Sequence, residues 1–280
     1  MRNLWGLAIA VFAGCLVKPQ PSSVTTDAPC AILGPWGSPV QLTGTFDTPA
    51  GARSPWLSAN GNELWFARRQ SPTDIDIFRA VRVNNTWGPA EPAVNVDDPN
   101  LQDNPFVSDD GMTMFYDAGT STTEQIQEAQ RPADGVTFGA PRLHSELSHG
   151  RIEPALSRDQ LTLYFSNGSS IYRATRTEPM TDFQPPQQLD SGGISIESPS
   201  IASDDTTLYV TGHIGGGTLI YTGTITGAAI TGLQTLPFET SGLYFDATVS
   251  RDGRTLVFAH TDDSTVPAHL WYVTRDCITQ

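Results

Sequence analysis

The hydrophobic and polar positions of this chain follow a short pattern that occurs five times. In each copy an apolar stretch ends at a polar turn, and a second apolar stretch follows it, at residues 55–66, 105–116, 154–165, 199–210 and 247–258. Each copy predicts two short strands joined by a tight turn, because Asn-Gly and Asp-Gly supply the positive φ angles of a two-residue hairpin turn. Asp159-Gln160 is the least favourable of these turns, since glutamine adopts such angles poorly.

The second strand of each copy is apolar on both of its faces. Its residues include Leu64, Leu163 and Leu256 on one face and Trp65, Tyr164 and Val257 on the other. A strand with two apolar faces is expected inside a stack of sheets, where both faces are covered.

Two further elements recur after each pair of strands. Residues 77–82, 171–176 and 270–275 predict a third strand, and Trp87-Gly88-Pro89 and Phe138-Gly139 begin a fourth. Proline is tolerated on an outer edge strand and is costly in a central one. A repeat of four short strands every ~45 to 50 residues is typical of a β-propeller blade.

The two ends of the chain complement each other. Trp36-Gly37-Ser38-Pro39 matches the fourth-strand element although no copy precedes it, and the fifth copy reaches Gln280 just after its third strand. We therefore predict an all-β fold, a five-bladed β-propeller of four-stranded blades, in which the N-terminal strand completes the last blade and removes free edges. The expected blades span 50–94, 95–144, 145–190, 191–238 and 239–280 together with strand 35–44.

Composition agrees with a single domain over 35–280. The chain has 280 residues, 38% of them hydrophobic, which is enough for one large all-β domain with a core. The formal net charge of −14 argues against nucleic acid as a partner. We expect a monomer.

Residues 1–15 have the composition of an export signal. Arg2 precedes an apolar stretch over 4–12 that is too short to span a bilayer, and Phe12-Ala13-Gly14-Cys15 follows it. This segment resembles the signal of bacterial lipoproteins, which implies that Cys15 becomes the lipidated N-terminus after cleavage. The alternative is an ordinary secretory signal with a chance cysteine.

The residues after Cys15 extend this resemblance. Leu16 stands where, in that family, an aspartate retains lipoproteins in the inner membrane, so the resemblance implies the outer membrane, facing the periplasm or the cell surface. Residues 16–34 are rich in Pro, Ser and Thr and predict a flexible tether. Contact with the membrane is expected through the lipid anchor only.

The remaining two cysteines lie at the predicted closure. Cys30 precedes the closing strand, Cys277 follows the strand that it is expected to pair with, and an exported compartment permits disulfides. We predict a Cys30–Cys277 disulfide that fastens the two ends of the ring, against the alternative of two unrelated thiols. A Cα–Cα distance far above ~7 Å would contradict it.

The repeat itself resembles a known family. The copies share the pattern Pro-x-Leu-Ser-x-Asp-Gly-x-x-Leu-Tyr-Phe followed by Ile-Tyr-x-Ala-x-Arg, which is similar to the WD40-like repeat of periplasmic TolB-type propellers, over residues 36–276. The resemblance implies a propeller and, in many members, an interaction or scaffold role at the cell envelope. TolB has six blades and an extra N-terminal domain, whereas this chain has five copies and no such domain, so the specific role of TolB is not implied.

A charged position precedes the first strand of each copy. It is occupied by Arg53, Asp103, Glu153, Glu197 and Asp246, near the expected mouth of the central channel. Carboxylates around one mouth can hold a cation or a basic group. Alternatively, each one caps local backbone N–H groups as part of the repeat. The sequence predicts no cofactor and no metal site.

One further cluster suggests zinc. His144 and His149 flank Glu146, but their spacing is not that of a helical zinc motif, and a solvated polar loop is the favoured interpretation.

The predicted function is a non-catalytic binding or scaffold module that contacts a protein or a glycan at the cell envelope. The alternative is a five-bladed glycoside hydrolase that uses channel carboxylates. Against this alternative, the acids occupy near-identical positions in the repeat, whereas an acid and a nucleophile need different environments.

Overall fold

The computed structural model describes residues 30, 32–93, 95–96, 100–120, 122–132, 137–147, 150, 152–214, 217–238 and 241–278. The predicted signal, most of the predicted tether and Cys15 lie outside these residues. In the described part the helical structure is one 3-10 turn, η1 (Ser145–Leu147), and all other regular elements are strands. No helix in this part is long and apolar enough to cross a membrane.

The strands form five groups that follow one another along the chain, except that the first strand, β1, belongs to the last group. Group one holds β2 (Arg53–Leu57), β3 (Glu63–Ser71), β4 (Asp74–Val83), β5 (Thr86–Trp87) and β6 (Glu91–Pro92). Group two holds β7 (Leu101–Val107), β8 (Thr113–Gly119), β9 (Gln125–Gln130) and β10 (Arg142–Leu143). Group three holds β11 (Ile152–Leu156), β12 (Thr162–Ser166), β13 (Ile171–Thr175) and β14 (Gln187–Gln188). Group four holds β15 (Ile196–Ile201), β16 (Thr207–Ile214), β17 (Gly217–Thr226) and β18 (Ala229–Thr235). Group five holds β19 (Leu243–Val249), β20 (Thr255–Thr261), β21 (His269–Thr274) and β1 (Val40–Gln41).

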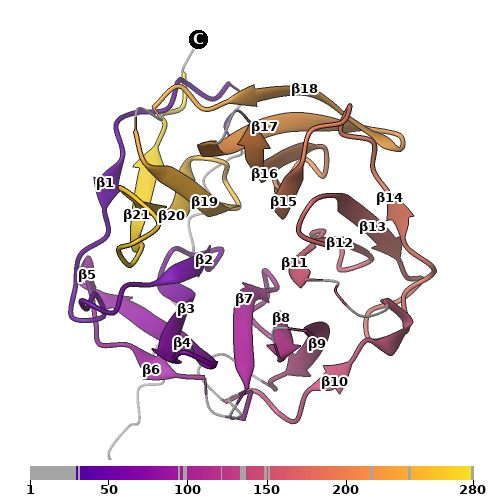
Figure 1. Ribbon diagram of the computed structural model, residues 1–280, viewed down its shortest axis with the longest axis horizontal. Helices are drawn as coiled ribbons and strands as arrows, with labels where there is room; N and C mark the ends of the chain where they lie inside the picture. Colours follow the sequence, from indigo (N-terminus) through magenta and orange to yellow (C-terminus); the bar gives the residue numbers. More distant parts are fainter. Residues whose placement is uncertain are drawn as a thin grey trace, which may run out of the picture.

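The groups surround a common centre. Figure 1 shows β2, β7, β11, β15 and β19 nearest to it, with the later strands of each group further out. Consecutive strands pair in antiparallel fashion within each group, except that β5 and β6 both pair with β4, and groups three, four and five are four-stranded sheets. A single parallel pair, Ile75 with Leu101, joins groups one and two into one nine-stranded sheet. This arrangement of stacked antiparallel sheets is that of a β-propeller.

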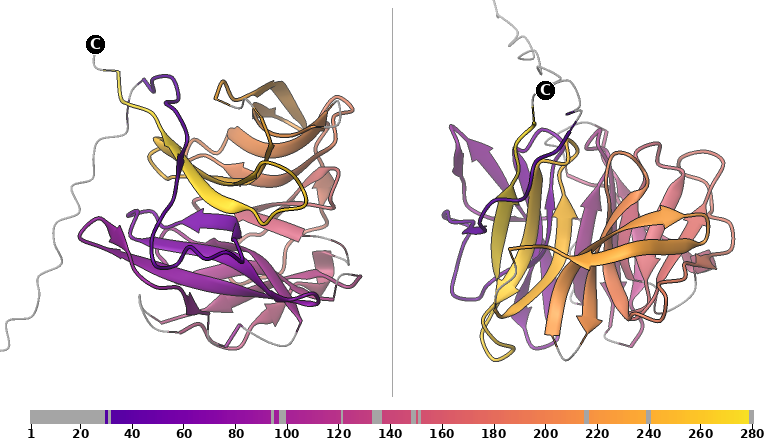
Figure 2. Two further views of the ribbon diagram at one scale, coloured as in Figure 1. Left: turned by 60° about the vertical axis from the view of Figure 1, so that its left-hand side comes forward. Right: turned by 90° about the horizontal axis from the view of Figure 1, so that it is seen from above.

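The N-terminal strand pairs with the C-terminal one. Val40 and Gln41 of β1 pair with Tyr272 and Trp271 of β21, and Gly37 donates its N–H to the carbonyl of Thr274 at 2.9 Å. Figure 2 shows β1 running beside β21, the last strand of the chain. The sheet order of group five is therefore β1-β21-β20-β19.

A disulfide joins the same two segments. Cys30 and Cys277 are bonded, with their Cα atoms 5.5 Å apart. Arg275 lies over the ring of Trp36 at 4.2 Å, as Arg82 lies over Trp87 at 5.8 Å in group one. The element around Trp36 thus makes the contacts in group five that its sequence counterpart makes in group one.

The core is divided among the interfaces between neighbouring groups. Trp65 and Tyr116 belong to a cluster of groups one and two, and Phe165 and Phe115 belong to one of groups two and three. Three further clusters join groups three and four, four and five, and five and one. Each sheet is therefore covered on both faces, as the doubly apolar second strands predict.

The hairpin turns differ from the prediction. Only one residue of each turn has a positive φ angle, and these residues are Gly61, Gly111, Gln160, Asp205 and Gly253. Each donates its N–H to the carbonyl three residues earlier, as Gln160 does to Ser157 at 2.9 Å. The prediction of two positive φ angles per turn is therefore wrong. In the third turn, for example, the carboxylate of Asp159 accepts hydrogen bonds from Ser157 Oγ at 2.6 Å and from the N–H of Leu161 at 2.9 Å, and these bonds support a turn with one positive φ angle.

Candidate functional site

The innermost strand of every group is interrupted at the same point. Its pairing register shifts by one residue between Arg53 and Trp56 in group one and at the corresponding place in the other four groups. Such a shift marks a β-bulge, which redirects the side chains beside it. The residues at the first position of the five bulges are Arg53, Asp103, Ile152, Glu197 and Phe245, and those at the second position are Ser54, Asn104, Glu153, Ser198 and Asp246.

This register corrects the sequence analysis in two respects. The five candidate residues lie within the innermost strands, not before them. In addition, Glu153 and Asp246 occupy the second position, where φ is 60° and 53°, whereas Asp103 and Glu197 occupy the first. The prediction of one repeated acidic position is wrong, because the sequence spacing is uneven by one residue and only the bulges show which residues correspond.

The structure nevertheless brings all five candidates to one cavity of about 280 Å³ at one end of the channel. We call this cavity the acidic mouth. Its walls include Arg53, Asp103, Glu153, Glu197 and Asp246 and two carboxylates that the sequence analysis missed, Asp117 and Glu124.

Asp117 belongs to the second strand of group two, opposite Asp103. Ser166 and Thr211 hold the corresponding place in groups three and four, opposite Ile152 and Glu197. A polar residue at one inward position of several otherwise apolar second strands was the signal that could have identified it.

The carboxylates of the mouth bond neighbouring groups together. Asp117 accepts the N–H of Glu153 at 2.9 and 3.0 Å and the side-chain amide of Asn104 at 2.7 Å. Glu153 in turn accepts the N–H of Ser198 at 2.6 Å, and it also accepts from the hydroxyl of Ser166. The positive φ angles at the second bulge position direct these N–H groups sideways, so that each can reach the adjacent group.

The same pattern completes a circle around the channel. Asp246 accepts the hydroxyl of Ser198 at 2.9 Å and that of Ser54 at 3.1 Å, and Ser54 also donates its hydroxyl to Asp103 at 2.8 Å. Arg53 forms an ion pair with Asp103. Asp117, Glu153 and Asp246 therefore cap backbone N–H groups of adjacent strand groups. Asp103 caps the N–H of Asn104 in its own strand, as one interpretation of the sequence expects.

Burial gives these acids different protonation states. Removal from water, together with the charges of Glu197 and Asp246, raises the pKa of Glu153 to about 8. Burial and the charge of Asp103 raise the pKa of Asp246 to about 6, while Arg53 opposes the rise. Burial also raises the pKa of Asp117 well above its usual range. At neutral pH Glu153 therefore holds a proton and Asp246 is ionised, although Ser198 bonds to both.

Replacing Glu153 by glutamine is expected to stabilise the protein at pH 8 and to change little at pH 5. A carboxyl group with a folded pKa of about 8 and an ordinary value of 4.5 binds its proton more tightly in the folded state, so its ionisation across that window destabilises the fold. Glu153 is half-buried, so we expect the substitution to recover only about 2 kcal/mol of the stability that ionisation removes at pH 8. Thermal unfolding at both pH values measures the effect, with Glu178→Gln as the exposed control. An equally steep pH dependence in the Glu153→Gln protein would contradict the prediction.

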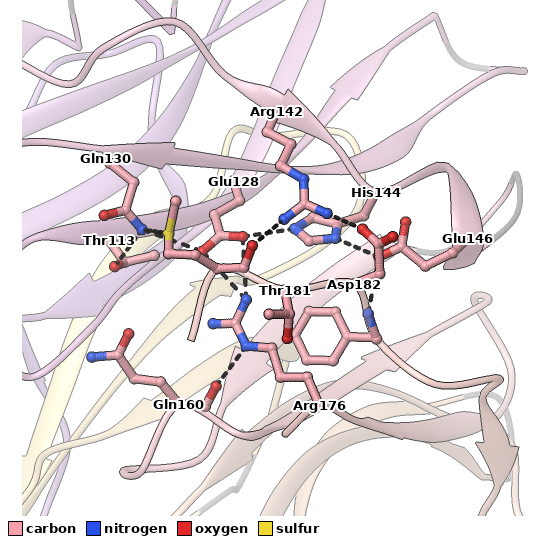
Figure 3. A network of polar contacts seen from close by, with 12 residues as sticks. Thr113, Glu128, Gln130, Arg142, His144, Glu146, Gln160, Arg176, Thr181 and Asp182 are labelled. Carbon is pink, nitrogen blue, oxygen red and sulfur yellow. Dashed lines mark hydrogen bonds and ion pairs between the residues drawn. The ribbon is translucent and has the colours of Figure 1, made fainter. Parts of the chain in front are cut away.

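The zinc candidate has a different role in the structure. His144 is 1% exposed and lies between two carboxylates, with Nδ1 2.7 Å from Glu146 and Nε2 2.9 Å from Glu128. Arg176 completes the cluster 3.3 Å from Glu128, and Figure 3 shows how the four side chains converge. The interpretation of His144 as part of a solvated loop is wrong, because its ring packs between the rings of Phe115 and Phe183. His149 lies outside the described residues, and among the described residues no group of three or more His, Cys, Asp or Glu side chains is arranged to hold a metal ion.

Comparisons with known proteins relate the chain to others by fold. No protein-family model matches the sequence, and none of the curated proteins matches it. Among solved structures, the putative TolB of Agrobacterium tumefaciens is similar with a TM-score of 0.53 and 15% identity, over 77% of this chain and 72% of that one. TolB of Acinetobacter baumannii gives 0.55 and 14%, over 81% of this chain and 55% of that one. A GH62 hydrolase in complex with xylotriose gives 0.60 and 11%, over 86% and 97%. The resemblance to TolB-type β-propellers is therefore confirmed at the level of fold, which hydrolases share.

Proposed function

We propose that this protein is a lipid-anchored, non-catalytic binding module at the bacterial envelope and that its acidic mouth takes a cationic group of its partner. In this proposal the fold is a five-bladed propeller that β1 closes. The antiparallel pairing of β1 with β21 and the Cys30–Cys277 disulfide support the closure. The disulfide and the Phe12-Ala13-Gly14-Cys15 segment support export, since disulfides persist in oxidising compartments.

The charge of the mouth carries the binding proposal. Six carboxylates and one guanidinium line a cavity of about 280 Å³, close to the lower end of the size range of small-ligand pockets. Even with Glu153 and Asp117 protonated, the mouth keeps a negative charge that attracts cations. An organic ammonium or guanidinium group is favoured over a metal ion, because the described residues offer no metal-ligating cluster.

Spermidine is a suitable probe of this site. We expect it to bind the wild-type protein in calorimetric titrations at low ionic strength and to bind a Glu124→Gln/Glu197→Gln variant roughly tenfold more weakly, because two charges at the mouth are lost. The matched control is Glu91→Gln/Glu178→Gln, which removes the same charge from exposed positions elsewhere. Equal weakening in both variants would show a general charge effect and would exclude the mouth as the binding site.

One observation favours a hydrolase as a second candidate. Glu153 and Asp246 are bridged by Ser198, and their pKa values of about 8 and about 6 leave one protonated and one ionised at neutral pH. Such a pair can divide the roles of general acid and of base or nucleophile in glycoside hydrolysis. This differentiation removes the objection that the acids have identical settings.

A hydrolysis assay separates the two candidates. Xylotriose is the appropriate first substrate, since a GH62 hydrolase with the same fold was solved in complex with it. If the protein only binds, the wild-type protein should cleave xylotriose no faster than the Glu153→Gln variant does. If the wild-type protein cleaves xylotriose and the variant does not, the hydrolase function is correct and the binding proposal is wrong.

A further inference from the structure

A second cavity lies beside the acidic mouth, where groups one and five meet. Its volume is about 400 Å³, and it lies between the 50–53 and 67–69 segments of group one and the 243–245 and 261–268 segments of group five. The two groups are in contact there, since Ala52 donates its N–H to the carbonyl of Ala268 at 2.8 Å. We call this cavity the seam groove.

The walls of the seam groove are mainly apolar and held in place. They include Ala50, Ala52, Leu243, Phe245, Val266 and Pro267. Gly51 fixes one wall: its φ is +73°, and a Cβ atom there would lie 2.3 Å from the carbonyl oxygen of Ala268. This close contact sets the position of the 50–52 wall relative to Ala268.

Three arginines also line this groove, namely Arg53, Arg68 and Arg69. Arg53 is paired with Asp103 in the acidic mouth. By contrast, neither Arg68 nor Arg69 forms an ion pair with any of the described residues. Arg68 donates to the carbonyls of Phe46 and Gly51, and Arg69 donates to that of Pro72 at 2.8 Å.

The charge of Arg68 is only partly compensated. Its guanidinium lies over the rings of Phe66 and Phe78, 5.3 and 5.0 Å from their centroids. Burial lowers the pKa of Arg68, and the charge of Asp47 does not offset this effect. Two guanidinium groups that form no ion pair with the described residues thus lie beside an apolar wall in a protein of net charge −14.

We propose that the seam groove binds a carboxylate carried on an apolar chain. The apolar chain would lie along Leu243, Phe245 and Val266, where burial of hydrocarbon surface is favourable. The carboxylate would accept hydrogen bonds from Arg68 or Arg69, since guanidinium groups match carboxylate geometry. Both a free fatty acid and the C-terminus of an apolar peptide have this chemistry. The proposal does not depend on cation binding at the acidic mouth.

Octanoate is the first probe of the groove. Octan-1-ol is the matched control, because it has the same hydrocarbon chain without the charge. We expect calorimetric titration to show octanoate binding and octan-1-ol binding at least about fivefold more weakly. Val266 is 47% exposed, so Val266→Glu should fold and should weaken octanoate binding at least about tenfold by placing a carboxylate in the groove. Val83→Glu is the matched control, since Val83 is 63% exposed on the β4 strand, away from the groove, and it should bind as the wild type does.

Arg69→Gln provides a second, independent variant at an exposed position. It is expected to weaken octanoate binding about fivefold and to leave octan-1-ol binding unchanged.

The two ligand sources are distinguished by a tetraleucine peptide with a free or an amidated C-terminus. Tighter binding of the free peptide than of octanoate favours a peptide, and the reverse favours a fatty acid. Absence of binding by both probes, equal binding of acid and alcohol, or equal effects of Val266→Glu and Val83→Glu would each overturn the proposal.

Discussion

Replacing Cys277 by serine is expected to lower the free energy of unfolding by up to about 5 kcal/mol. The bond between Cys30 and Cys277 joins residues 247 positions apart in sequence, so it excludes a very large set of unfolded conformations. It also holds in place β1, a strand of only two residues whose pairing with β21 completes the sheet of group five. Loss of the bond should therefore both destabilise the domain and expose the edge of β21.

Urea unfolding of the oxidised wild-type protein and of Cys277→Ser measures this effect. Cys30→Ser and the double variant are the controls, and all three should be equally destabilised, because each removes the same bond. Wild-type protein treated with a reductant should behave like the variants. Free thiols at Cys30 and Cys277 in the untreated protein, found by mass measurement, or unfolding midpoints that are the same for all four proteins, would contradict the prediction.

Replacing Glu128 by alanine is expected to cost about 3 to 5 kcal/mol of stability. Glu128 is 2% exposed. Its carboxylate accepts hydrogen bonds from His144 of group two, at 2.9 Å, and from Arg176 of group three, at 3.3 Å. Its removal leaves the buried guanidinium without a carboxylate. His144 would keep only Glu146, 2.7 Å away. The guanidinium of Arg176 would stay buried without compensation, which is the costly result of breaking a buried ion pair.

The rim of the same network provides the matched control (Figure 3). Arg142 pairs with Asp182, whose side chain is 73% exposed. Asp182→Ala should therefore cost less than about 1 kcal/mol, as exposed ion pairs do. Urea unfolding of the two variants tests the difference. A cost below 1 kcal/mol for Glu128→Ala would show that water or relaxation compensates the cluster and would contradict the prediction.

The elements that the sequence predicts correctly are those with a local physical cause. The doubly apolar stretches at 64–66 and 163–165 are central strands, because no other arrangement covers both faces. The turns between strands are present as well, but their angles were mispredicted. Gln160 adopts a positive φ at the last turn position, where the hydrogen bonds of Asp159 and Ser157 support it.

The candidate site was predicted in part. Its five residues meet at one mouth, yet their roles differ in a way that the sequence does not show. One extra residue in each innermost strand reverses the side-chain alternation, so Glu153 corresponds to Ser54 and not to Asp103. Asp117 was missed because it lies on a second strand, where the pattern predicts apolar residues.

By itself, the sequence determined the strand repeat, the match between the two chain ends and the cysteine pair that lies beside them, since these follow from local patterns of polarity and turn residues. The folded structure is needed to show which carboxylates share a cavity, which of them has the most strongly raised pKa, and that His144 is buried between two acids. The shared cavity depends on contacts between strand groups some 45 to 50 residues apart, whereas His144 meets Glu128 and Glu146 within its own group. Each property also depends on burial, which changes the free energy of a charge without changing the sequence around it.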